Sequence, residues 1–90
     1  MLSNLIRAHQ ANDANKISQL LLDLTPDWVE NLGLVSASTH SIELLASIQG
    51  KTWLVTITSS FHGAHVRVHK NDCKRTQSRL SKDLALRANF

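Results

Sequence analysis

Three histidines and the single cysteine of the chain follow one another at short intervals: His62, His65, His69 and Cys73. Imidazole nitrogen and thiolate sulfur are the usual protein ligands of zinc, so this series is the first candidate for chemistry. The intervals would bring all four groups together only on a helix. Residues 64–70 alternate between apolar and polar side chains, as a strand does, which places His65 and His69 about 13 Å apart. We therefore expect no metal ion and no other cofactor.

Nucleophiles and acid–base groups are present, but their arrangement is not typical of an enzyme. The sequence contains no nucleophile turn, no glycine-rich phosphate loop and no paired carboxylates at a catalytic spacing. Cys73 falls with Gln77 and Leu80 on the side of a C-terminal helix that we expect to face the core, where a thiol is poorly placed to react. The sequence predicts a non-catalytic protein.

Basic residues near the C-terminus have a more informative spacing. Arg75, Arg79 and Lys82 recur at i, i+4 and i+7, so a helix aligns them along one face. Lys70 and Lys74 widen this row at the start of the helix. Cations on successive turns can neutralise several phosphates, so the row is a candidate nucleic-acid site. The alternative is an ordinary solvent-exposed face, although such faces usually mix both signs of charge.

A second group of candidates lies on the strand before that helix. The alternation that turns two valines toward the core leaves His65, Arg67 and His69 on the opposite face. Cations and hydroxyls on this face suit contacts with phosphates. No aromatic residue falls there, which favours duplex over single-stranded nucleic acid. If the N-terminal helices cover this face instead, Arg67 needs an acidic partner such as Glu43.

The strands that position these groups are well defined by their pattern. Apolar and polar side chains alternate on both sides of Gly50-Lys51, which suits a two-residue turn that places Ile48 opposite Trp53. A second reversal at residues 60–63 leads into the histidine-containing strand. We expect a three-stranded antiparallel meander with one apolar face.

Helical signals dominate the N-terminal third. Within residues 1–33, Asn12-Asp13 can cap the start of a second helix. The spacing of apolar residues before Thr25 allows either one bent helix or two short helices. Thr25-Pro26 is a typical helix start and Gly33 a typical helix end, which predicts a further short helix.

After the strands, Asn71 or Asp72 is expected to cap a C-terminal helix whose apolar side packs on the sheet. The predicted fold is therefore α+β, in the order α-β-β-β-α. A chain of 90 residues forms a single domain, residues 1–90. Its parts are a helical layer (1–33), a sheet (41–70) and a basic helix (72–88).

Charge is sorted along the chain. Residues 1–50 contain two Lys or Arg and five Asp or Glu, a net charge of −3, whereas residues 51–90 contain eight and two, a net charge of +6. Such asymmetry indicates a polyanionic or acidic partner for the basic half. The single cysteine fits a reducing compartment. The sequence has neither a signal peptide nor the roughly 20 apolar residues that span a bilayer, so we expect a soluble cytoplasmic protein with no membrane contact.

The order of helix, three antiparallel strands and basic helix resembles that of the double-stranded RNA-binding domain, over residues 13–88. Lys74-Arg75 sits where that family places its phosphate-contacting lysines. The family's glycine-proline-histidine loop between its first two strands is replaced here by Gln49-Gly50-Lys51. The resemblance implies a surface for duplex phosphates at the start of the last helix.

These residues support two functional hypotheses. The first is a small nucleic-acid-binding module whose C-terminal helix and neighbouring strand contact phosphates. The second is a protein-binding adaptor or inhibitor, of the kind that phages or mobile elements encode, which docks its basic face on an acidic or nucleic-acid-binding surface of a larger protein. Leu86 favours the second, because an apolar side chain among cations is a typical hot spot. Leu20, Leu21 and Leu22 also suggest a homodimer through the N-terminal helices.

Overall fold

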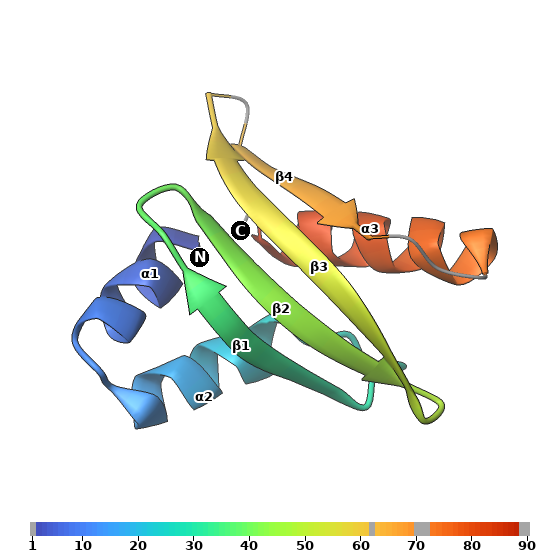
Figure 1. Cartoon of the computed structure of the whole chain (residues 1–90), viewed down its shortest axis with the longest axis horizontal. Helices are drawn as coiled ribbons and strands as arrows, with labels where there is room; N and C mark the ends of the chain where they lie inside the picture. The colour runs from blue at the N-terminus through green and yellow to red at the C-terminus, as the bar shows by residue number, and fades with distance from the viewer. Residues whose placement is uncertain (1, 62, 70–72, 89–90) are drawn as a thin grey trace.

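The computed structural model describes residues 2–61, 63–69 and 73–88, which form three helices and one antiparallel sheet (Figure 1). Two helices come first and one comes last: α1 (Leu2–Gln10), α2 (Ala14–Leu24) and α3 (Lys74–Ala88). The four strands lie between them in the sheet order β1-β2-β3-β4. Their bounds are Asn31–Ala37, Ser41–Ile48, Lys51–Ser60 and Gly63–Val68. The fold is α+β, as the sequence predicted, but with one strand more.

The short third helix that was expected after Thr25 does not form: residues 25–30 are a loop, and the strand β1 begins at Asn31. Thr25 ends α2 instead of beginning a new helix: its backbone is extended, and its N–H donates to the carbonyl oxygens of Leu21 and Leu22. Gly33 lies within β1, opposite Leu45 of β2. A segment of seven residues has little helical stability of its own, so pairing with β2 decides its conformation. The added strand changes the element order to α-α-β-β-β-β-α, which departs from the double-stranded RNA-binding domain.

The N-terminal segment forms two helices, so the structure chooses between the two alternatives. Asn12 interrupts the helix with a φ of 54°. Asp13 then caps α2, and its Oδ1 accepts a hydrogen bond of 3.1 Å from the Lys16 amide. A cap of this kind contributes about 1 kcal/mol. The expected cap of α3, Asn71 or Asp72, lies outside the described residues.

The β2–β3 turn lies one residue earlier than predicted, which shifts the strand register by two residues. Gln49 and Gly50 have φ values of 51° and 77°, so they are its two central residues. Ile48 consequently pairs with Lys51, and the predicted pairing with Trp53 is wrong. Two consecutive left-handed residues are typical of a type I′ turn, whose twist matches that of the strands. Because the shift is even, the same side chains still face the core.

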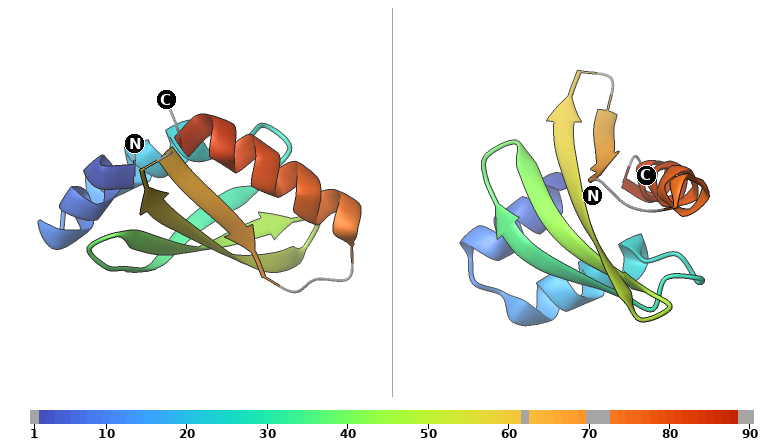
Figure 2. Two further views of the ribbon diagram at one scale, coloured as in Figure 1. Left: turned by 90° about the horizontal axis from the view of Figure 1, so that it is seen from above. Right: turned by 45° about the vertical axis from the view of Figure 1, so that its right-hand side comes forward.

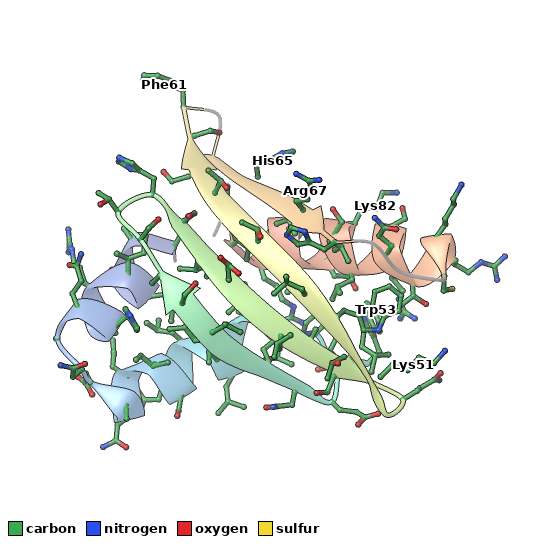
Figure 3. All side chains as sticks on the ribbon, in the orientation of Figure 1. Lys51, Trp53, Phe61, His65, Arg67 and Lys82 are labelled. Carbon is green, nitrogen blue, oxygen red and sulfur yellow. The ribbon has the colours of Figure 1, made fainter. Side chains whose placement is uncertain are left out.

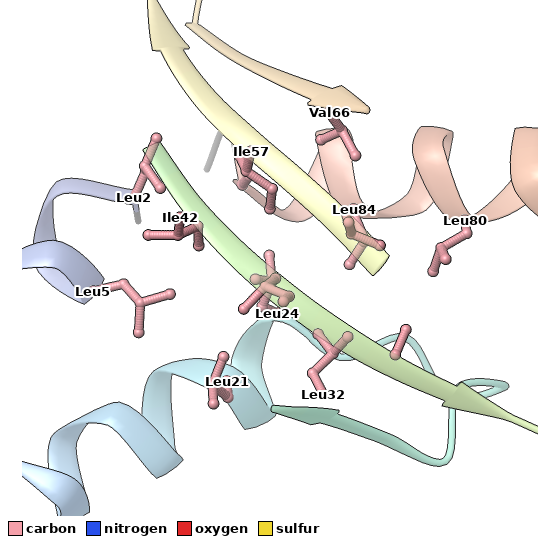
Figure 4. Close-up of a cluster of buried hydrophobic side chains, with 14 of the residues drawn as sticks. Leu2, Leu5, Leu21, Leu24, Leu32, Ile42, Ile57, Val66, Leu80 and Leu84 are labelled. Carbon is pink, nitrogen blue, oxygen red and sulfur yellow. The ribbon is translucent and has the colours of Figure 1, made fainter. Parts of the chain in front are cut away.

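All three helices pack on one face of the sheet (Figure 2). Their side chains meet the inward side chains of the strands in a single buried cluster (Figure 4). Its fully buried members include Leu5, Leu24, Ile42, Ile57, Leu80 and Leu84. No described helix covers the opposite face, which we call the open face. Hydroxyl side chains predominate there, together with the basic side chains of β4.

Candidate nucleic-acid interface

The outer side of α3 carries a row of basic side chains. Leu80, Leu84 and Ala88 are buried against the sheet, whereas the other side of the helix is exposed. That exposed side consists mainly of Lys74, Arg75, Arg79, Lys82 and Leu86, which we call the basic row. The helix thus separates an apolar side from a basic side, as its residue spacing predicts. Lys70, expected to extend the row, lies outside the described residues.

The single carboxylate of α3, Asp83, flanks the basic row, four residues after Arg79. Its Oδ2 accepts a hydrogen bond of 2.6 Å from Nε1 of Trp28, in the loop between α2 and β1. Both side chains are half-buried. Asp83 thus accepts from a neutral donor, and it is the one carboxylate of α3 beside the four cations of the basic row.

Trp28 also contacts the basic row itself. The guanidinium carbon of Arg79 lies 4.3 Å from the centroid of the Trp28 ring, which is a cation–π contact. This contact orients Arg79 while leaving it exposed. Sequence reasoning did not include Trp28 among the functional residues. The tryptophan itself was the signal that could have identified this residue, because a partly buried indole N–H requires a hydrogen-bond acceptor.

The strand β4 adds exposed basic side chains next to α3. His65 and Arg67 project from the open face, near Lys82 of α3 in Figure 3. The two elements are in direct contact, because Gln77 Nε2 donates a hydrogen bond of 3.0 Å to the carbonyl oxygen of Val68. The basic row and the β4 cations therefore belong to adjoining surfaces.

The open face leaves Arg67 uncovered, so the alternative in which the N-terminal helices bury it is not realised. Glu43 pairs with Thr56, and Thr56 pairs with Arg67, so a whole strand separates the two charged residues. His69 is half-buried, and its Nε2 lies 2.7 Å from Thr56 Oγ1. A phosphate that binds His69 therefore competes with the Thr56 hydroxyl.

Cys73 is exposed, so the prediction that it faces the core is wrong. It precedes α3, and its carbonyl accepts the Gln77 amide, so the periodicity of the helix does not apply to its side chain. A hydrogen bond of 3.2 Å from Thr76 Oγ1 to the sulfur lowers the pKa of the thiol, with a smaller contribution from Arg75. Among the described residues, which exclude His62, no three His, Cys, Asp or Glu side chains are grouped to hold a metal ion.

A second candidate feature is a cleft of about 600 Å³ at the C-terminal end of α3. Arg7 of α1 and His40 of the β1–β2 turn line it, together with the hydroxyls of Ser3, Thr39, Ser59 and Ser60. The described residues around it include no carboxylate to orient a histidine base and no thiol. The cleft therefore supports a catalytic role less well than the basic row supports binding.

Comparisons with known proteins identify no relative of this chain. The chain matches no family model, no curated protein and no solved structure at the significance required for a relationship. Within the described part of the chain, no helix has both the length and the apolar character needed to cross a bilayer. The functional argument consequently depends on the geometry of this chain.

Proposed function

We propose that this protein is a small, non-catalytic nucleic-acid-binding module that contacts duplex phosphates through α3 and β4. The observation that carries the proposal is the basic row, whose four cations share the exposed side of one helix that contains a single carboxylate, Asp83. Cations that bind several phosphates at once release condensed counterions, and this release is the main source of sequence-independent affinity.

Each part of the surface has a role in this proposal. Arg75 and Lys82 contact phosphates directly, and Arg79 does so in the direction set by Trp28. His65 and Arg67 on β4 supply a second line of contacts. Since the Trp28 ring already stacks with Arg79, the surface favours the backbone of a duplex over unstacked bases.

Binding to mixed-sequence duplex DNA and duplex RNA at several salt concentrations tests the proposal. We expect dissociation constants of about 1 µM or tighter at low salt, rising steeply with added salt. The variant R75Q/R79Q/K82Q removes three phosphate contacts, so the slope of log K against log salt should become shallower by about 2 to 3. Absence of binding at low salt would eliminate the proposal.

The matched control is R7Q/K16Q/K51Q, which removes three exposed cations outside the interface and changes the net charge equally. We expect this control to retain most of its affinity. Because Arg79→Gln also removes the contact with Trp28, the double variant R75Q/K82Q tests the row with that contact intact. Equal losses in both triple variants would indicate diffuse attraction and contradict a localised interface.

A protein-binding adaptor or inhibitor is the second candidate, and Leu86 is the observation that favours it. This side chain is 63% exposed on the same helix face as the cations. Under the first proposal, Leu86→Ala leaves duplex binding unchanged. A protein partner that survives nuclease treatment and is lost in Leu86→Ala would favour the second. Both functions are proposed for the cytoplasm, where a single cysteine stays reduced.

A further inference from the structure

The two edges of the sheet differ in whether another segment of the chain is hydrogen-bonded to them. The outer edge of β4 is hydrogen-bonded to α3: Gln77 Nε2 donates to the Val68 carbonyl at 3.0 Å, and Ser81 Oγ donates to the Val66 carbonyl at 3.4 Å. Both carbonyls belong to β4 residues whose backbone groups point away from β3. This edge is therefore closed by the helix beside it.

The strand β1 forms the other edge, and no hydrogen bond in the described part of the chain joins its outer side to another segment. The Ser38 amide donates to the Ser41 carbonyl, so the odd-numbered residues of β2 bond toward β1, and Gly33 is one of their partners. Its neighbours Leu32 and Leu34 then present their N–H and C=O groups outward. Backbone groups of this kind are a template for another strand.

The sequence of β1 contains no charged residue and no proline to oppose such pairing. Its seven residues, Asn31–Ala37, include neither Lys, Arg, Asp, Glu nor Pro. A register shift between Leu34 and Ser36 leaves Val35 52% exposed and limits regular pairing to the part of the strand before it. Edges that stay unpaired in natural proteins are protected by charges, prolines or bulges, and residues 31–34, before the bulge, have none of these, so this part of the edge is open to a strand partner.

We propose that β1 pairs antiparallel with β1 of a second copy, about a two-fold axis at Gly33. In this register, Leu32 of each copy lies opposite Leu34 of the other, and the outward backbone groups of both strands are used. The two leucine side chains face the helices, where Leu32 is buried and Leu34 half-buried. Leucines of the second copy therefore extend the apolar layer at this edge, where Leu34 packs against the core and is only partly buried.

A second copy fits this edge better than it fits the N-terminal helices, the interface that the sequence suggested. Leu20 and Leu21 are buried in the core of their own chain, and only Leu22 of this run is exposed, at 73%. A single exposed leucine on a helix is ordinary. The edge of β1, in contrast, has a defined complement, because a second copy supplies the same uncharged segment with outward backbone groups at Leu32 and Leu34.

Sedimentation velocity of the full chain, from about 5 to about 500 µM, tests the proposal. Pairing along one edge buries less than the roughly 800 Å² per partner of a stable interface, so we expect a dissociation constant on the order of 10 to 100 µM. Gly33→Lys places two like charges opposite each other and should weaken the dimer about tenfold or more. The monomer tolerates this change, because Gly33 does not have a positive φ and a Cβ there meets nothing within 4 Å.

The control is Thr52→Lys, which adds the same charge at an exposed position of β3, with β2 between it and the edge. This variant should dimerise like the wild type. Amide hydrogen exchange at Leu32 and Leu34 should slow as the protein concentration rises. A monomer at all concentrations, or equal effects of the two lysines, would overturn the proposal. So would a dimer that only Leu22→Glu disrupts, or a monomer that takes up an unrelated extended peptide along β1.

Discussion

The two long sides of the sheet differ in how their edges are closed and in the charge around them. On the β4 side, α3 is hydrogen-bonded to the strand edge and presents cations to solvent. On the β1 side, the described residues leave the edge unpaired, and the helices behind it belong to the acidic half of the chain. Where a helix closes the edge, the available interaction is electrostatic. Where nothing closes it, the available interaction is backbone hydrogen bonding.

These two kinds of interaction differ in how strongly they depend on salt concentration. Contacts between exposed cations and phosphates weaken steeply with ionic strength, because counterion release drives them. Strand pairing with apolar contacts depends much less on salt. Binding of duplexes and association of two copies should therefore respond differently to the same salt titration, which allows each proposal to fail without the other.

The largest difference between the two sides should come from leucine truncation. Leu84 is fully buried between α3 and the sheet, so Leu84→Ala should lower the free energy of unfolding by about 3 kcal/mol. Leu34 at the β1 edge is half-buried, so Leu34→Ala should lower it by about 1 kcal/mol. Urea denaturation at low protein concentration measures both. Equal losses would show that the β1 edge is packed as tightly as α3, and the contrast between the sides would not hold.

A smaller effect is expected from the hydrogen bond between Trp28 and Asp83. Trp28→Phe keeps an aromatic ring beside Arg79 but removes the N–H that donates to Asp83, which should cost about 1 to 2 kcal/mol of stability. Asp83→Asn is the control, because its amide oxygen still accepts from the indole and should cost less. Thermal unfolding measures the stability of the two variants. A larger loss of stability in Asp83→Asn than in Trp28→Phe would mean that the charge of Asp83 contributes more than the hydrogen bond.

The smallest effect concerns Cys73, at the start of α3. The Thr76 hydroxyl lowers the pKa of this thiol, so at neutral pH more of it is thiolate than in an ordinary cysteine. Thr76→Val removes the donor, and the pKa of Cys73 should rise toward its ordinary value. Alkylation by iodoacetamide should then slow at pH 7 and shift its rate profile to higher pH. Thr52→Val, far along the chain, should leave the profile in place, and an unchanged profile in Thr76→Val would contradict the role of the hydroxyl.

Local patterns were sufficient for most elements, and they failed where a distant partner decides the structure. The cap at Asp13 and the two sides of α3 depend on residues a few positions apart, so spacing alone predicts them. Thr25-Pro26 is a typical local helix signal, but the residues after it form a loop, and pairing with β2 makes the chain a strand from Asn31 on. The β2–β3 turn was placed one residue too late, because the sequence favours Gly50 at the first central position and the structure uses it at the second.

The sequence by itself determined which side chains share a face: the valines and leucines of the core, the histidines and Arg67 of β4, and the cations of α3. It did so because strand and helix periodicities are local properties of the chain. Only the tertiary structure decided that α3 closes the β4 edge, that β1 is left at the other, and that Trp28 donates a hydrogen bond to Asp83. That last contact joins residues 55 positions apart. Contacts of this kind depend on how whole elements pack, which no local pattern encodes.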